Sequence, residues 1–193
     1  MCVNVEHYAK VRGFPKLAAG EDFHILNKLA KTGTIRQLSA PVLTIEDRIS
    51  LRVPFGTGPT LAKLEGQTLE EIALFEPSEA FYQLKVLLDQ LPALWAMQDV
   101  EKMLDCVKAA IGETAFSAVN LEKGIRHAVK QSKSEAQFIK QWHSFLDALA
   151  TLRLIHALTD HKHINAAQLI KSPVPWLKPS QIERLIKVTR RKD

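Results

Sequence analysis

The chain has 193 residues, of which 46% are hydrophobic, and it carries a formal net charge of +5. This length supports one domain with a sizeable core, or a small mixed domain with a helical extension. No segment has the pattern of a signal peptide, and no uncharged stretch is long enough to cross a bilayer, so we expect a cytoplasmic protein without a membrane span. The two cysteines allow at most one disulfide, and Cys106 falls on the apolar side of a predicted helix, which favours a buried thiol.

The positive charge is concentrated towards the two ends of the chain. Residues 1–66 hold nine Lys/Arg against six Asp/Glu, residues 67–170 hold ten against thirteen, and residues 171–193 hold seven against two. The three regions therefore carry +3, −3 and +5. A polyanionic partner such as DNA fits this asymmetry, and a basic chain without such a partner is the alternative.

The N-terminal residues predict a helix followed by two strands. Residues 1–20 show no clear period and predict an irregular arm, while Glu21–Thr32 predicts a short amphipathic helix that stops at Gly33. Two β-prone runs follow, Pro41–Ile45 and Ile49–Phe55. The second run alternates apolar and polar residues, as a half-buried strand does.

A glycine-rich elbow, Gly56-Thr57-Gly58, joins the second run to a short helix-like segment, Pro59–Glu65. Residues 67–75 are ambiguous. Thr68 and Glu71 form a capping-box pattern that favours a helix, whereas the apolar residues of this stretch equally suit a third strand.

From Pro77 onward the spacing of the apolar residues is helical. The expected helices are Ser78–Leu91, residues 92–111 before a stop at Gly112, a helix from Thr114 to Val129, a long helix from Ser134 to about Thr159, a short helix capped by Asn165, and a last one from Ser180. We therefore predict an α+β fold, with a small mixed β-sheet in residues 1–76 and a helical half in residues 77–193, packed together as one unit.

The elbow is the first candidate site, because unpaired backbone N–H groups at a helix N-terminus can hold a phosphate. Its glycine spacing matches neither a P-loop nor the dinucleotide fingerprint, so a plain strand-to-helix turn is the alternative. The predicted binding residues are Gly56, Thr57, Gly58 and Thr60, with Arg52 and Lys63 neutralising the phosphate charge.

Acidic residues near the elbow provide the candidate catalytic groups, Glu65, Glu70 and Glu71. One of them would serve as a ligand for Mg²⁺ or as a general base in phosphodiester cleavage. Glu70 and Glu71 point apart on either a helix or a strand, so at most one of them faces any site. A solvated acidic surface is the alternative interpretation.

Three histidines cluster around the end of the long predicted helix, namely His156, His161 and His163, with Asp160 between them. No cysteine pair accompanies them, and His161 and His163 are too close in sequence to share a helix face. A zinc enzyme at these histidines is therefore only the third functional hypothesis.

The C-terminal residues form a basic run on the last predicted helix. Such cations complement the helix macrodipole, and they can equally contact a nucleic-acid backbone. The candidate nucleic-acid-binding residues are Lys187, Arg190, Arg191 and Lys192.

The order of elements in residues 20–76 resembles the ParB/sulfiredoxin fold superfamily, in which a helix that ends in glycine precedes two strands and a glycine-containing motif at a helix start. The matching pieces are Leu26–Gly33, Pro41–Ile45, Ile49–Phe55, Gly56-Thr57-Gly58-Pro59, and Leu61–Gly66 before Leu69–Phe75. ParB-like members carry Gly-Glu-Arg-Arg at the elbow and sulfiredoxin-like members carry a cysteine there. This chain has neither.

The resemblance implies a nucleotide- and DNA-binding protein with ATPase or DNase activity, for which ATP and Mg²⁺ are the expected cofactors. The length and the helical C-terminal half also resemble plasmid fertility-inhibition proteins of the Osa type. That likeness implies a protein partner in the machinery of conjugative (type IV secretion) DNA transfer. The alternative function is a non-enzymatic helical adaptor that binds a protein and contacts nucleic acid through its basic ends.

Overall fold

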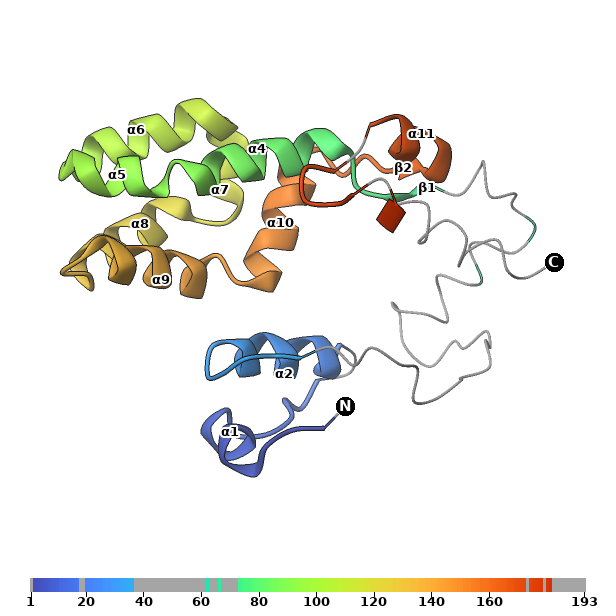
Figure 1. The fold of residues 1–193 in the computed structure, drawn as a ribbon, viewed down its shortest axis with the longest axis horizontal. Helices are drawn as coiled ribbons and strands as arrows, with labels where there is room; N and C mark the ends of the chain where they lie inside the picture. The colour runs from blue at the N-terminus through green and yellow to red at the C-terminus, as the bar shows by residue number, and fades with distance from the viewer. Residues whose placement is uncertain are drawn as a thin grey trace. The chain divides into compact units, whose positions relative to one another are not determined.

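The computed structural model describes residues 2–17, 20–36, 62, 66, 73–172, 174–178 and 180–181 (Figure 1). The chain divides into two compact units, Met1–Gln67 and Thr68–Asp193.

The described part of the first unit contains two helices, α1 (Val5–Lys10) and α2 (Glu21–Ala30). The irregular arm predicted for residues 1–20 is thus partly wrong, because the Asn4 side chain accepts a hydrogen bond from the Glu6 amide at 2.8 Å and caps α1. The helix predicted over Glu21–Thr32 is confirmed as α2. The unit has its own small core of Val11, Ile25 and Leu29.

The described part of the second unit is built mainly of helices that pack around one apolar core. Its most buried large side chains come from several helices and include Leu87, Leu94, Val107, Phe138 and Trp142. The helices are α4 (Ser78–Asp89), α5 (Leu91–Met97), α6 (Val100–Ile111), α7 (Glu113–Ala118), α8 (Leu121–Lys130), α9 (Glu135–Phe145), α10 (Ala148–Leu158) and α11 (Ala166–Lys171). We call α4 to α10 the helical bundle.

Several of the predicted helices are divided in the structure. The long helix expected from Ser134 to Thr159 is wrong, because Asp147 accepts hydrogen bonds from the amides of Leu149 and Ala150 and so starts α10. Asp99 starts α6 in the same way inside the predicted helix 92–111. Asn120 interrupts the next one by adopting a left-handed conformation with φ of 53°.

The predicted α+β fold with a small mixed β-sheet is wrong. The described residues are mostly helical, and their strands are the short β1 (Ala73–Phe75) and β2 (Ile164–Asn165). These two pair in antiparallel fashion, with Phe75 opposite Ile164. Apolar residues at helical spacing bury one another helix against helix, so this unit needs no sheet to cover its core. The predicted strands Pro41–Ile45 and Ile49–Phe55 lie outside the described residues.

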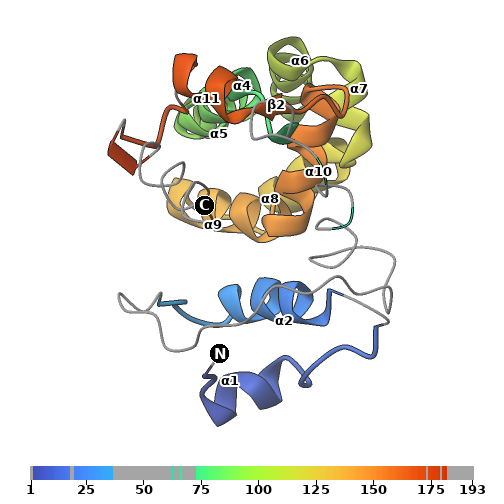
Figure 2. The same cartoon turned by 90° about the vertical axis from the view of Figure 1, so that its right-hand side faces the viewer.

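A second, smaller apolar cluster lies beside the bundle core. Leu169 and Val174 are buried in it, and the half-buried side chains packed against them are Phe75, Phe81, Ile164 and Leu177. We call residues 164–172 and 174–178 the C-terminal module. Both views place β2 and α11 at the end of the bundle where α4 begins and α10 ends (Figure 1, Figure 2).

Cys106 is exposed, contrary to the prediction, because the buried face of α6 is formed by Met103, Leu104, Val107 and Ile111. Within the described ranges, no helix is long and apolar enough to cross a membrane.

Candidate metal centre

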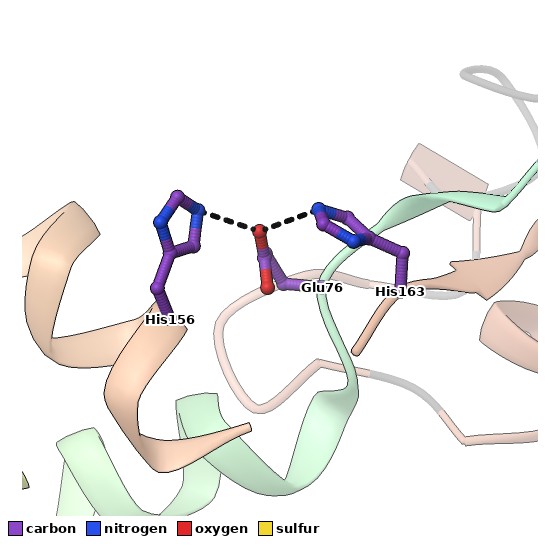
Figure 3. A group of neighbouring side chains, drawn as sticks. All are labelled: Glu76, His156 and His163. Carbon is purple, nitrogen blue, oxygen red and sulfur yellow. Dashed lines mark ion pairs between the residues drawn. The ribbon is translucent and has the colours of Figure 1, made fainter. Parts of the chain in front are cut away.

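Three potential metal ligands meet where the bundle adjoins the C-terminal module. One oxygen of Glu76, Oε1, lies 3.0 Å from Nε2 of His156 and 3.3 Å from Nε2 of His163. One ligand atom from each of the three residues lies within 4.8 Å of the other two. Figure 3 shows the carboxylate between the two imidazoles. We call these three residues the triad.

The position of Glu76 follows from the residues on either side of it. Phe75 ends β1, and Pro77 is the N-cap of α4 with φ of −56°. The proline ring disfavours helical backbone at the residue before it. Glu76 therefore stays outside the helix, at the corner between strand and helix.

The two histidines that contact Glu76 belong to different segments of the chain. His156 lies in the last turn of α10. His163 immediately precedes β2, and since Phe75 pairs with Ile164 in an antiparallel register, the next opposed residues are Glu76 and His163. The short pairing of β1 with β2 thus places a histidine opposite a glutamate.

The turn between the two histidines has an unusual backbone. Asp160 and His161 both adopt left-handed conformations, with φ of 51° and 56°. For non-glycine residues each such conformation costs about 1–2 kcal/mol. Backbone hydrogen bonds from His161 to the carbonyl of His156 and from Lys162 to that of Thr159 hold the turn. Strain of this kind concentrates at functional sites.

The triad is partly buried and Glu76 is its most enclosed member. The side chains of Glu76, His156 and His163 are 15%, 29% and 40% exposed. The second carboxylate oxygen of Glu76, Oε2, is buried and has no hydrogen-bond partner among the described residues. A buried polar atom without a partner costs about 1–3 kcal/mol, and an ion is one explanation for such an atom.

The spacing of the triad fits a transition-metal ion. Zinc bonds of about 2.0–2.1 Å in tetrahedral geometry place neighbouring ligand atoms about 3.3 Å apart. The two contacts of Glu76 Oε1, at 3.0 and 3.3 Å, are close to this separation, and one ring nitrogen of each histidine lies within 4.8 Å of the other. Two imidazoles and one carboxylate are the protein ligands of many catalytic zinc sites and of non-haem iron sites.

A third histidine stands beside the triad. The centre of the His156 ring lies 5.2 Å from that of the His161 ring and 6.3 Å from that of the His163 ring. His161 is exposed and does not belong to the group of atoms that lie within 4.8 Å of one another.

The residues predicted for the elbow, for catalysis and for nucleic-acid binding all lie outside the described part of the chain. These are the elbow residues Arg52, Gly56, Thr57, Gly58, Thr60 and Lys63, the carboxylates Glu65, Glu70 and Glu71, and the basic residues Lys187, Arg190, Arg191 and Lys192. Those predictions therefore remain predictions.

The histidine cluster was recognised in the sequence without its acidic partner. Glu76 is about eighty residues away along the chain, and its own sequence signal is slight: an acidic residue between an apolar run and a proline. A zinc site built from histidine and glutamate needs no nearby cysteine, so the lack of a cysteine pair does not argue against it.

Comparison of the chain with family models, curated proteins and solved structures gives no match in any of the three. The geometry of the triad and the distribution of charge are therefore the basis for the functional proposals.

Proposed function

We propose that the protein binds a divalent transition metal, of the Zn²⁺ class, through Glu76, His156 and His163. The observation that carries this proposal is the pair of short contacts from one Glu76 oxygen to two imidazole nitrogens, at 3.0 and 3.3 Å. Imidazole ligands favour zinc and its neighbours over Mg²⁺, which prefers oxygen ligands.

Three protein ligands leave a coordination position for water or a substrate. Structural zinc sites are closed by four protein ligands, whereas catalytic sites keep a position open. The exposure of His163 leaves one side of the triad accessible to solvent. A bound metal of this kind supplies Lewis acidity and lowers the pKa of its water, which is the chemistry of a hydrolytic centre.

The experiment is isothermal titration calorimetry with ZnCl₂ and, separately, MgCl₂ on the full chain. We expect one Zn²⁺ per chain and no comparable binding of Mg²⁺. Glu76→Gln and His156→Gln should each weaken Zn²⁺ binding by more than the 10–100-fold that loss of an outer partner produces. His143→Gln removes an exposed histidine on α9 and is the matched control, for which the affinity should not change. Equal affinity in all four proteins would refute the proposal.

DNA binding is a second candidate function, and the charge of the first unit favours it. Residues 2–17 and 20–36 hold six Lys/Arg against three Asp/Glu, and all six cationic side chains are exposed. They are Lys10, Arg12, Lys16, Lys28, Lys31 and Arg36. A basic surface of this kind binds phosphates with an affinity that falls as salt rises.

This second proposal retains the activities that the two resemblances imply, namely ATPase or metal-dependent DNase activity and inhibition of conjugative DNA transfer. Fluorescence anisotropy with labelled DNA across a salt series tests the binding. Deleting residues 187–193 and substituting Thr57→Ala with Lys63→Ala separate the basic C-terminal run from the elbow. Salt-independent binding, or none at all, would contradict the proposal, and a plasmid-nicking assay with Mg²⁺ and ATP tests cleavage.

A further inference from the structure

The three triad residues come from different parts of the second unit. Glu76 lies between β1 and α4, and His156 belongs to α10, so both adjoin the helical bundle. His163 immediately precedes β2, the first element of the C-terminal module. Any ion held by all three residues therefore bridges the bundle and the module.

Among the described side chains, the module packs less extensively than the bundle. Its apolar cluster contains two buried side chains, Leu169 and Val174, compared with the much larger core of the bundle. Its strand pairing joins a three-residue strand to a two-residue strand, with an irregularity in the register. An isolated two-stranded pairing is marginally stable in water.

Phe81 on α4 is the described side chain that packs against both apolar clusters. The triad supplies a polar connection between the bundle and the module, through Glu76 to His156 on one side and Glu76 to His163 on the other. Without a metal this connection consists of two contacts to one carboxylate oxygen, while Glu76 Oε2 is left without a described partner.

From these observations we propose that metal occupancy controls the docking of the C-terminal module. The metal-bound triad fixes the module on the bundle, and the metal-free triad lets it open. This inference rests on the proposed metal binding and assigns that site a regulatory role.

A ligand that binds the docked form and not the open form lowers the population of the open form by the factor 1 + [L]/Kd. At a free Zn²⁺ concentration of about 100 Kd, opening of the module becomes about 100-fold rarer. Amide hydrogen exchange reports such local opening directly. Amides of α11 and β2 that exchange through this opening should therefore exchange about 100-fold more slowly with Zn²⁺.

The test is hydrogen–deuterium exchange followed by mass spectrometry on the full chain, with and without Zn²⁺ at a concentration that calorimetry shows to be saturating. We expect slower exchange in peptides that cover residues 164–178, and a smaller change in α6 and α8, which carry no triad residue. Glu76→Gln keeps an oxygen that accepts hydrogen bonds but is a poor metal ligand, so Zn²⁺ should not protect the module in this variant. The control variant, His143→Gln, should behave like the wild type.

Two outcomes would overturn the inference and leave metal binding intact. In the first, Zn²⁺ binds by calorimetry but exchange across residues 164–178 does not change. In the second, protection extends equally through α6 and α8, which indicates general stabilisation rather than docking of one module. If calorimetry detects no Zn²⁺ binding, the proposed function itself fails. His163→Gln adds a further check, since it removes the one ligand beside the module and should abolish protection there even where Glu76 and His156 retain some Zn²⁺.

Discussion

Replacing Gly124 by alanine should destabilise the protein, although the same change in an exposed helix is stabilising. Gly124 is buried within α8, which packs against α9. A Cβ atom at this position would overlap both Cδ1 and Cε1 of Phe145 and would lie 2.8 Å from its Cγ. Favourable carbon–carbon contacts are about 3.5–4.0 Å, so the ring has to move by about 1 Å or more.

The expected size of the effect is the difference between two terms. Alanine gains about 1 kcal/mol over glycine in a helix interior. Overpacking a well-filled contact costs about 1–3 kcal/mol, and here three ring atoms are affected, which favours the upper part of that range. We therefore expect Gly124→Ala to lower the free energy of unfolding by about 1–2 kcal/mol.

Urea unfolding followed by circular dichroism measures this change. The control is the same substitution in a Phe145→Ala background, where the ring is absent. There Gly124→Ala should raise the free energy of unfolding, by up to about 1 kcal/mol, because only the helix-propensity term remains. Refutation would be an unchanged or increased stability of Gly124→Ala in the wild-type background, which would show that α8 and α9 do not approach so closely at this point.

Three further predictions concern caps, pH and the core. Asp147→Ala removes the cap of α10 and should cost about 1 kcal/mol in urea unfolding, with Asp105→Ala, an exposed acid within α6, as a nearly neutral control. The hydrogen bond from the Lys102 amide lowers the pKa of Asp99 below its ordinary value of 3.8. The stabilisation by the ionised Asp99 is therefore present at neutral pH and is lost as pH falls through the folded-state pKa. The difference in stability between Asp99→Asn and the wild type should shrink from pH 7 to pH 3, and an equal difference at both would contradict this. Phe138 is fully buried, so Phe138→Ala should cost about 3–5 kcal/mol, and a loss below 1 kcal/mol would place it outside the core.

Local signals in the sequence located the starts of several helices correctly. Ser134 caps α9 by accepting a hydrogen bond from the Gln137 amide, and Asn165 forms a capping box with Gln168 at the start of α11. Gly112 ends α6, as predicted. Each of these signals acts over three or four residues, so the sequence alone is sufficient to read it.

The division of the longer helices could not be read in the same way. Asp99 and Asp147 stand within continuous apolar patterns, where an aspartate is compatible with an exposed helical position or with a cap. Packing decides between the two, because a break lets the next segment turn and bury its own apolar face. Cys106 is exposed because it lies off the face of α6 that Met103, Leu104 and Val107 bury.

The sequence by itself determined that the chain after Pro77 is helical, that its charge is concentrated towards the ends, and that histidines gather near residue 160. Only the tertiary structure joined His156 and His163 to Glu76. That contact depends on an antiparallel pairing of very short strands from opposite ends of the second unit and on a left-handed turn at Asp160 and His161. Neither feature produces a periodic residue pattern that could be recognised in the sequence, because both are fixed by contacts between segments far apart along the chain.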